Sequence, residues 1–394
     1  MADKKILIVG AGLGGLAAAS CLLKAGFDVE VYEQAPMLAE VGAGIQMSAN
    51  PMHVLRHLGL EDDVLRLGVQ PGAYVFRLHD TGEVIQDFPL AAEHQRQHGA
   101  PYVQLHRADL HELLATAASK LKPDLIRLNH RATGFTETDN GVTLHFADGS
   151  SAEGDILIGA DGLKSTIARQ IVGKIPATYT GDGAWRITVP TERLPKPFLP
   201  EVMSVFMGPG GHAVCYYLRG GALLNFVGIT ETELASEESW TQKFPWEMLK
   251  KDYEGWHPAI QTIIDAADHD QCYRWSLHNR PPVRNWSTKR ATILGDAAHA
   301  TLPYLAQGAA MAIEDGAVLA RALRQENDIA AALDLYQRNR VDRTARIVET
   351  STQNRRLFHL PTQDAIRAEF SKRNEGESRN RWLYSYNPLT VELT

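Results

Sequence analysis

A glycine-rich turn near the N-terminus constrains the fold of this chain more than any other feature. Residues 4–9 (KKILIV) predict a short buried strand, and residues 28–33 (DVEVYE) predict a second one. Between them lie the turn, residues 10–15 (GAGLGG), and residues 16–25, which predict a helix that ends at Gly26. Strand, turn, helix and strand in this order predict the start of a parallel α/β sheet.

The glycine spacing in this turn fits the GxGxxG pattern of dinucleotide-binding proteins. Gly10 allows the tight turn, Gly12 lets the backbone approach a pyrophosphate, and Gly15 lets the helix pack closely. The helix N-terminus then directs its partial positive charge toward the phosphates, and Glu33 stands where an acid is expected to bind a ribose hydroxyl. The predicted dinucleotide-binding residues are Gly10, Gly12, Leu13, Gly14, Gly15, Glu33 and Gln34. The pattern alone does not distinguish FAD from NAD.

The rest of the chain divides into α/β segments and a sheet-like insertion. The predicted elements are helices over residues 51–67, 107–119, 311–324 and 329–350, a β meander over 125–158 and a strand over 291–295. Residues 176–272 carry prolines, aromatic residues and short alternating runs, which predict an antiparallel substrate-binding sheet. We therefore expect a cofactor domain (1–175 with 273–350), interrupted near 75–100 by part of the substrate domain, then the sheet domain (176–272) and a helical tail (351–394).

Composition excludes several classes of function. The formal net charge is -7 with no clustered run of Lys or Arg, which gives no support to nucleic-acid binding. The apolar stretch before Leu23 is broken by glycines, so it predicts neither a signal peptide nor a membrane span. Cys21, Cys215 and Cys272 have no paired spacing, so we expect neither disulfides nor a metal site, and we expect a reducing, cytoplasmic location.

Two further motifs follow the first at a distance. One is residues 158–162 (IGADG) with Ser165, where Asp161 and Gly162 alone would predict only a turn. The other is residues 294–299 (LGDAAH), where Asp296 alone would predict only a helix cap, followed by Gly308 and Ala309 at the start of a helix. With the glycine turn, and in this order from about residue 6 to 387, they resemble the group A flavoprotein hydroxylases, the family of the p-hydroxybenzoate and salicylate hydroxylases.

The resemblance implies a Rossmann-like FAD-binding domain interleaved with the antiparallel substrate domain. It assigns Arg107 and Asp296 to FAD, Asp161 and Gly162 to both FAD and the nicotinamide, and the helix start at Gly308 and Ala309 to the flavin pyrimidine ring. Since no second GxGxxG occurs, it also implies that NADH or NADPH binds transiently, as a co-substrate without its own domain.

Closer resemblance implies the branch of salicylate hydroxylase, 3-hydroxybenzoate 6-hydroxylase and 6-hydroxynicotinate 3-monooxygenase. It is carried by residues 41–50, 101–111, 211–228 and 295–315. In that branch a histidine and a tyrosine of the substrate sheet face the ring, which implies that His212 and Tyr216 are catalytic. Four residues apart on one strand, they share a face, whereas Tyr217 points the other way. His212 is then a base or phenolate relay, or else a hydrogen-bonded structural histidine.

Further substrate contacts are expected from Gln46, Tyr102 and Tyr217. Arg186 and Arg219 could hold a substrate carboxylate, although pairing at the surface or between strands is the alternative we favour. Gln46 stands where the 6-hydroxynicotinate enzymes carry a histidine, and Pro303 where other members place a glutamine or histidine. Both departures count against assigning one particular substrate.

The expected activity is NAD(P)H- and O2-dependent hydroxylation of a small, salicylate-like aromatic acid through a flavin C4a-hydroperoxide. Hydroxylation of 3-hydroxybenzoate or 6-hydroxynicotinate, a flavin epoxidase or reductase, and a non-catalytic flavin redox sensor are the alternatives. In the tail, Trp382, Leu383, Tyr384 and Tyr386 would form either a homodimer patch or an intramolecular contact.

Overall fold

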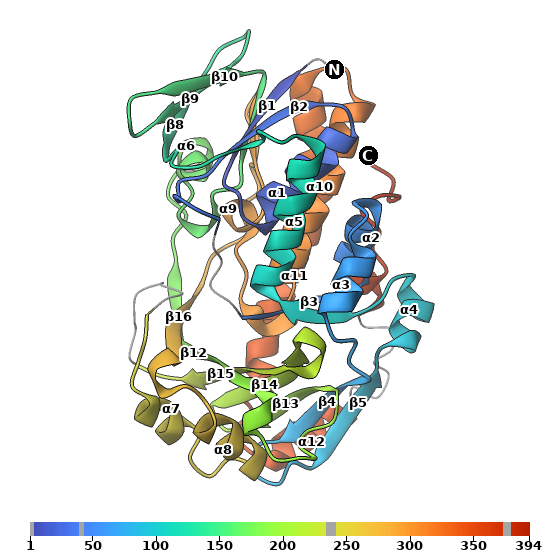
Figure 1. Ribbon diagram of the computed structural model, residues 1–394, viewed down its shortest axis with the longest axis vertical. Coiled ribbons are helices and arrows are strands. Elements are labelled where there is room, and N and C mark those ends of the chain that lie inside the picture. Colours follow the sequence, from blue (N-terminus) through green and yellow to red (C-terminus); the bar gives the residue numbers. More distant parts are fainter. Residues whose placement is uncertain (1–3, 39–42, 234–241, 373–379) are drawn as a thin grey trace.

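The computed structural model describes residues 4–38, 43–233, 242–372 and 380–394. Parts of the predicted sheet domain (176–272) and of the predicted tail (351–394) lie outside these ranges. The described chain has two halves, one above the other in Figure 1. We call them the parallel-sheet half and the seven-stranded half.

Five parallel strands form the sheet of the upper half, in the order β17-β11-β1-β2-β7. Their bounds are β1 Lys5–Val9, β2 Asp28–Tyr32, β7 Ile126–Arg127, β11 Ile156–Gly159 and β17 Ala291–Ile293. Ile6, Leu7 and Ile8 of β1 have no exposed surface. A strand covered on both faces is expected to be continuously apolar, so this sheet lies inside a layered α/β half.

Helices cover one face of the parallel sheet and a small antiparallel sheet covers the other (Figure 1). The helices are α1 (Leu13–Lys24), α5 (Arg107–Leu121), α10 (Gly308–Gln325) and α11 (Ile329–Phe358), and the small sheet has the order β10-β9-β8 (β8 Ala132–Glu137, β9 Val142–Phe146, β10 Ser151–Gly154). A Cβ at Gly316 of α10 would lie 2.7 Å from the Cα of Ala18 in α1. The two helices therefore pack at backbone contact, which fixes both of their N-termini.

The lower half is a mixed sheet in the order β16-β12-β15-β14-β13-β4-β5. Its strands are β4 (Ala73–Leu78), β5 (Val84–Pro89), β12 (Thr178–Pro190), β13 (Met203–Gly208), β14 (Gly211–Leu218), β15 (Leu223–Glu231) and β16 (Tyr273–Asn279). All neighbours are antiparallel except β13 and β4, which are parallel. Helices α7 (Trp246–Asp252) and α8 (Pro258–Asp265) cover the lower face in Figure 1, and the upper face looks toward the parallel-sheet half.

Short elements connect the halves. The two-stranded pair β3 (Gly44–Met47) and β6 (Val103–His106) lies at the junction. The other helices are α2 (Ala49–His57), α3 (Glu61–Leu67), α4 (Ala92–His98), α6 (Thr166–Val172), α9 (Asp296–His299), α12 (Gln363–Ser371) and α13 (Arg381–Tyr384); the short 3-10 turns are η1 (Gly162–Lys164), η2 (Thr191–Arg193), η3 (Arg219–Gly221), η4 (His269–Gln271) and η5 (Pro303–Leu305).

Several predicted boundaries were wrong. The helix predicted over 51–67 is two helices, because Gly59 between them has φ +80°. The seven-stranded sheet does not end at 272, since β16 pairs with β12 and extends it to Asn279. The helix predicted to end at 350 continues to Phe358 and so crosses the predicted start of the tail. In the predicted meander only β8, β9 and β10 form one, while β7 and β11 join the parallel sheet.

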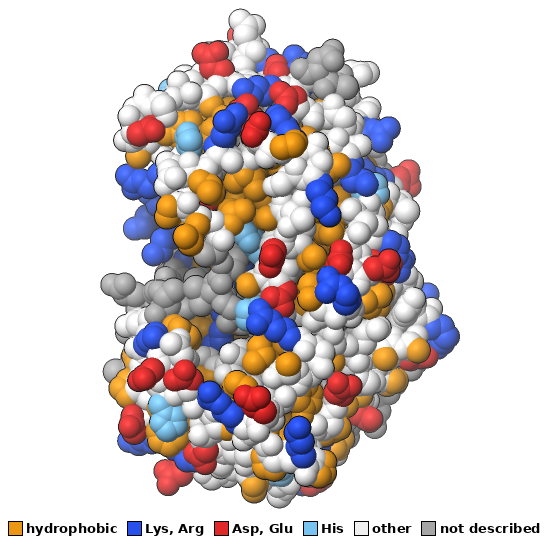
Figure 2. Space-filling view, viewed as in Figure 1, with side chains coloured by type: hydrophobic (Ala, Val, Ile, Leu, Met, Phe, Trp, Pro, Cys, Tyr) orange, Lys and Arg blue, Asp and Glu red, His pale blue; other side chains and the backbone are white. Residues whose placement is uncertain are grey.

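The described part of the tail packs on its own chain. Leu383 is buried with Met311 and Ile347, and the Tyr384 ring contacts that of His94, with centroids 5.2 Å apart. This is the intramolecular alternative, and the homodimer remains a prediction. Acidic and basic side chains are interspersed over most of the face in Figure 2. Among the described helices, none is long and apolar enough to cross a bilayer.

Candidate active site

The glycine turn between β1 and α1 has the geometry that its spacing predicts. Gly10 has φ +103°, and a Cβ there would lie 2.4 Å from the carbonyl oxygen of Ala160. A Cβ at Gly15 would lie 2.0 Å from the carbonyl oxygen of Gly10, so both positions require glycine for close packing. Around Gly12, in contrast, no described atom lies within 4 Å of where a Cβ would be. That open space at the N-terminus of α1 can admit a ligand.

Glu33, after β2, ties the turn to the next loop. One carboxylate oxygen accepts from the Ala11 N–H at 2.9 Å, and the other accepts from the Ala35 N–H at 2.9 Å. Each oxygen can accept a second hydrogen bond, so the carboxylate can still bind a ribose hydroxyl. Gln34 beside it is exposed.

A cavity of about 350 Å³ joins the turn to the upper face of the seven-stranded sheet. Of the predicted cofactor residues, it is lined by Gly12, Leu13, Gly14, Arg107, Gly162, Asp296, Gly308 and Ala309, and of the predicted substrate and catalytic residues by Gln46, His212 and Tyr216. The structure therefore brings three sequence-distant motifs and the substrate sheet to one site. Gly10, Gly15, Glu33, Gln34 and Asp161 do not line this cavity.

The start of α10 forms another wall of the cavity, at the end where the predicted cofactor residues lie. Its N-cap, Gln307, makes no side-chain cap and instead turns its amide toward α2, with Nε2 donating to Ser48 Oγ at 3.1 Å. The first turn has no acidic residue, and Gly308 lines the cavity. The positive end of the α10 dipole thus faces the cavity. Asp296, nearby at the start of α9, is an exposed carboxylate in the same wall.

Asp161 has a structural position. One of its carboxylate oxygens accepts from Ser165 Oγ, and the other accepts from the Thr166 and Ile167 N–H groups at 2.7 and 3.2 Å. These bonds cap the N-terminus of α6. Burial raises the pKa of the Asp161 carboxyl. Its neighbour Gly162, with φ +74°, lines the cavity, so Asp161 acts on the site by holding this turn.

The substrate wall is formed by β14. His212 and Tyr216 are 2% and 3% exposed and both line the cavity, as their four-residue spacing predicts. A Cβ at Gly44 of β3 would lie 2.4 Å from the Tyr216 hydroxyl oxygen, so only glycine lets β3 pass this ring. Burial raises the pKa of Tyr216, which keeps it a neutral phenol. Burial and the neighbouring His359 hold the pKa of His212 well below its ordinary value, which keeps its imidazole neutral.

Gln46 faces β14 from β3. The Tyr102 hydroxyl donates to Gln46 Oε1 at 2.7 Å, but Tyr102 itself lies behind Gln46 and does not line the cavity. Tyr102 therefore orients Gln46. Tyr217 was wrongly predicted as a substrate contact: it lies on the opposite face of β14, and its hydroxyl donates to the Leu199 carbonyl at 2.8 Å.

Arg186 and Trp275 line the cavity, although neither was favoured as a substrate contact from the sequence. Arg186 lines the cavity with its guanidinium 4.6 Å from the centre of the Trp275 ring, whereas Arg219 forms a surface ion pair with Asp109 as favoured. Trp275 also lines the cavity, from β16. The alternation of Trp275 and Leu277 in residues 273–279 could have revealed this strand.

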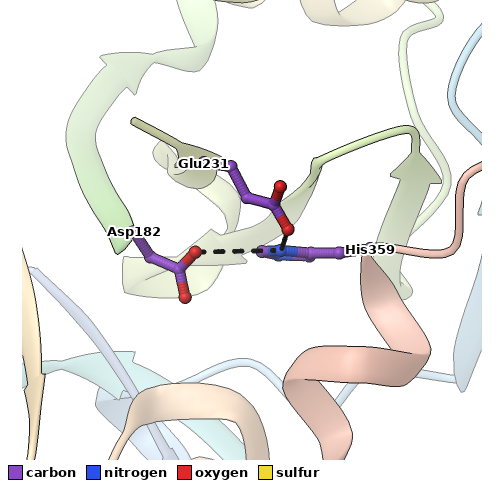
Figure 3. Close-up of side chains that lie close together, drawn as sticks. All are labelled: Asp182, Glu231 and His359. Carbon is purple, nitrogen blue, oxygen red and sulfur yellow. Dashed lines mark hydrogen bonds and ion pairs between the residues drawn. The ribbon is translucent and has the colours of Figure 1, made fainter. Parts of the chain in front are cut away.

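Asp182, Glu231 and His359 form a cluster (Figure 3), and His359 in it lies 3.1 Å from the His212 ring. Their ligand-type atoms lie within 4.8 Å of one another, as in a metal site. However, Arg355 binds both oxygens of Asp182, at 2.5 and 2.7 Å, and Tyr304 donates to it at 2.6 Å. A guanidinium already neutralises this carboxylate, so the cluster fits an ion-pair network rather than a cation site.

A second groove, of about 500 Å³, runs between α1, α3 and α5. Charges of both signs line it, among them Lys24, Asp63, Arg66 and Glu112, and none of the predicted site residues does. We interpret it as the solvated seam between helices.

Known proteins place this site in a family. The model described as FAD binding domain matches residues 3–351. A 6-hydroxynicotinate 3-monooxygenase of Pseudomonas fluorescens is 36% identical to this chain, over 99% of this chain and 96% of that protein. A 3-hydroxybenzoate 6-hydroxylase of Polaromonas naphthalenivorans is also 36% identical, over 98% of this chain and 97% of that protein. The crystal structure of Klebsiella pneumoniae HpxO with FAD and uric acid has a TM-score of 0.84 and 28% identity over 96% of this chain and 94% of that one. The resemblance drawn from the motifs is confirmed: the chain belongs to the family of FAD-dependent aromatic monooxygenases.

Proposed function

We propose that this protein hydroxylates a small aromatic acid that already carries a ring hydroxyl, using NADH or NADPH and O2. One observation carries the proposal: a single cavity holds both the cofactor motifs and the pair His212 and Tyr216. The names of relatives that are about a third identical, which act on hydroxybenzoates and hydroxynicotinate, support this substrate class.

The residues fit FAD. Gly12 leaves backbone and open space for a pyrophosphate, Asp296 offers an exposed carboxylate to a ribityl hydroxyl, and the positive end of α10 faces the cavity at Gly308. FAD held there would supply redox chemistry, taking electrons from the nicotinamide and activating O2, which is the source of the oxygen atom that enters the ring.

The side chains prepare the ring for that oxygen. Neutral His212 accepts the proton of the ring hydroxyl, which raises the nucleophilicity of the ring. Tyr216, as a neutral phenol, donates a hydrogen bond to the substrate. The Gln46 side-chain oxygen accepts from Tyr102, which orients the side chain, and its NH2 group can donate to the substrate. We assign the substrate carboxylate to Arg186, which lines the same cavity.

An apolar wall keeps this chemistry dry. Val214, Val227 and Ile229 line the cavity from β14 and β15. A low-dielectric surrounding strengthens the hydrogen bonds to the substrate and limits loss of the reactive oxygen to water. The departure at Gln46 leads us to favour a hydroxybenzoate over 6-hydroxynicotinate.

The test is a substrate screen with the purified flavin-loaded protein. Salicylate, 3-hydroxybenzoate and 6-hydroxynicotinate are added separately with NADH or NADPH while nicotinamide oxidation, hydrogen peroxide and products are measured. We expect at least one acid to accelerate nicotinamide oxidation and to yield a hydroxylated product with little peroxide. Peroxide alone with all three acids would identify a flavin reductase. No acceleration by any acid would favour a redox sensor.

A further inference from the structure

Three side chains form a continuous line from the cavity to the molecular surface. His212 lines the cavity, and its Nδ1 lies 3.1 Å from Nε2 of His359. Nδ1 of His359 lies 3.2 Å from Oε1 of Glu231, the contact drawn in Figure 3. The two histidine side chains are buried, whereas the Glu231 side chain is 49% exposed. The line therefore begins in the cavity and ends in water.

The three residues come from separate parts of the chain and are held rigidly. His212 is on β14, Glu231 ends β15, and His359 is the C-cap of α11. The His212 ring packs against Phe358 and Tyr304, with centroids 4.9 and 5.4 Å apart. These contacts keep the two imidazoles at hydrogen-bonding distance.

Building on the function proposed above, we propose that His212, His359 and Glu231 form a proton relay between the bound aromatic acid and solvent. Burial disfavours a charged imidazole at His212, so this residue must pass on the proton that it takes from the substrate rather than hold it. The described contacts of the His212 side chain include one hydrogen bond, to His359, which makes that residue the outlet.

The protons that pass along the relay balance over one catalytic cycle. On the way out, the substrate O–H bond breaks and His212 Nε2 gains the proton. His212 Nδ1 then passes the proton that it carries to His359 Nε2. His359 Nδ1 in turn passes the proton that it carries to the Glu231 carboxylate. Glu231 releases a proton to water. After hydroxylation the product phenolate is reprotonated by the same steps in reverse, which restores both tautomers. No electrons move along this path.

The charges around His359 suit transient protonation. Asp182 on β12 faces His359, with its Oδ1 3.9 Å from Nδ1 of the histidine. The other groups around His359 are Glu231 of β15, Arg355 of α11 and Tyr304 of η5. Burial lowers the pKa of His359 while Asp182 raises it. His359 is thus neutral at rest, with one donor and one acceptor nitrogen, and the carboxylates stabilise the cation formed in passing.

The experiment follows proton release rather than turnover alone. Oxidised, flavin-loaded protein in weak buffer with phenol red is mixed rapidly with whichever of the three acids gave product in the screen. We expect Glu231→Gln and His359→Ala to slow proton release by about tenfold or more. Added imidazole should restore the rate in His359→Ala, a rescue that a purely structural role would not produce.

Glu83→Gln is the matched control. Glu83 is also 49% exposed and is paired with Arg367 at the same sheet, away from His359, so its variant should release protons at the wild-type rate. Wild-type release rates in Glu231→Gln would overturn the relay even if His359→Ala does not fold. If wild-type protein hydroxylates none of the acids, the proposed function fails and the relay fails with it. The two failures can be distinguished, because the relay can fail while the wild-type protein still forms hydroxylated product.

Discussion

Arg186 reaches the cavity wall from β12, in the same sheet as His212 and Tyr216, and is our candidate anchor for the substrate carboxylate. A charge-assisted hydrogen bond contributes about 1.5–3 kcal/mol, which corresponds to roughly ten- to hundredfold in binding. We therefore expect Arg186→Met to raise KM for the aromatic acid by that factor while kcat changes less, measured by steady-state kinetics. Arg219→Met, which removes a surface arginine paired with Asp109, should leave KM unchanged. An unaltered KM in Arg186→Met would remove Arg186 from the substrate site.

Gly12 and Gly15 make different demands on the same turn. Because nothing lies within 4 Å of a Cβ at Gly12, Gly12→Ala should fold with wild-type stability but bind FAD about tenfold or more weakly. Gly15→Ala, whose Cβ would lie 2.0 Å from the Gly10 oxygen, should lose stability as well. Flavin fluorescence titration and thermal unfolding of the apoprotein separate the two effects. Equal losses of stability would contradict the open space inferred at Gly12.

Single residues differ in how far the sequence could predict them. The glycine turn could be predicted because the GxGxxG spacing is local in the sequence, although the contact that requires glycine at position 10 is with Ala160, far along the chain. His212 and Tyr216 could be paired because a strand places alternate residues on one face. His359 could not be found, since its contact with His212 spans 147 residues. The prediction that Tyr217 contacts the substrate was wrong, because its side chain points to the face of β14 opposite His212 and Tyr216.

Helix α2 shows how a buried histidine can replace a cap. Its N-cap, Ser48, makes no side-chain cap, and the N–H of Ala49 instead donates to Nε2 of His94 at 3.2 Å. This contact requires that His94 be neutral. Burial, and to a smaller extent the nearby His98, lowers the pKa of His94 from 6.5 to about 3. The unfolded chain therefore takes up this proton first as the pH falls.

The consequence is a pH-dependent free energy of unfolding. The contribution of His94 is fully present above pH 6.5 and is lost by about 1.4 kcal/mol per pH unit as the pH falls toward 3. In His94→Gln the amide oxygen can still accept from Ala49 but does not titrate. Between pH 7.5 and 5, urea unfolding should therefore lose about 2 kcal/mol less in this variant than in wild type. An identical pH dependence in both proteins would refute the assignment.

Helices and strands could be predicted where the apolar periodicity is local. The predictions were wrong where contacts with distant strands determine which sheet a strand joins. β1, α1 and β2 follow from the first 33 residues, because a buried strand and an apolar helix have distinct periods. β16 was assigned to the wrong half, since only its pairing with β12 reveals the sheet it joins. α2 and α3 were merged because the apolar pattern continues across Gly59.

Helix α11 connects the whole molecule. Its first turns pack in the core of the parallel-sheet half through Leu333 and Tyr336, and its last residues, Leu357 and Phe358, pack on the seven-stranded sheet. The interleaving of the two halves was predicted from the α/β pattern on both sides of the sheet segment, but this single helix spanning both was not. The relay residue His359 directly follows it.

Halfway along α11, a buried ionic network fixes it to α10. Arg340 has no exposed side-chain surface and lies 2.7 Å from both Glu314 and Asp315. Asp315 also lies 2.6 Å from His299. Burial would raise its carboxyl pKa, but His299 and Arg340 lower that pKa to about 2. Removing Arg340 would leave the buried carboxylates of Glu314 and Asp315 with only Arg343 and His299 as partners.

We expect Arg340→Met to destabilise the protein by about 3–5 kcal/mol, measured by urea unfolding. Arg338→Met on the same helix removes an exposed pair with Asp334, at the similar distance of 2.8 Å, and should cost less than about 1 kcal/mol. Similar losses for the two variants would show that the buried network is not what holds α10 and α11 together.

If one cavity joins reduced flavin, O2 and an aromatic acid, the oxygen of the new ring hydroxyl must come from O2. Turnover under ¹⁸O2 with the productive acid, followed by mass spectrometry of the product, tests it most directly. We expect one ¹⁸O atom in the new ring hydroxyl for each nicotinamide oxidised. Product oxygen derived from water, or labelled hydrogen peroxide as the only oxygen-containing product, would contradict it.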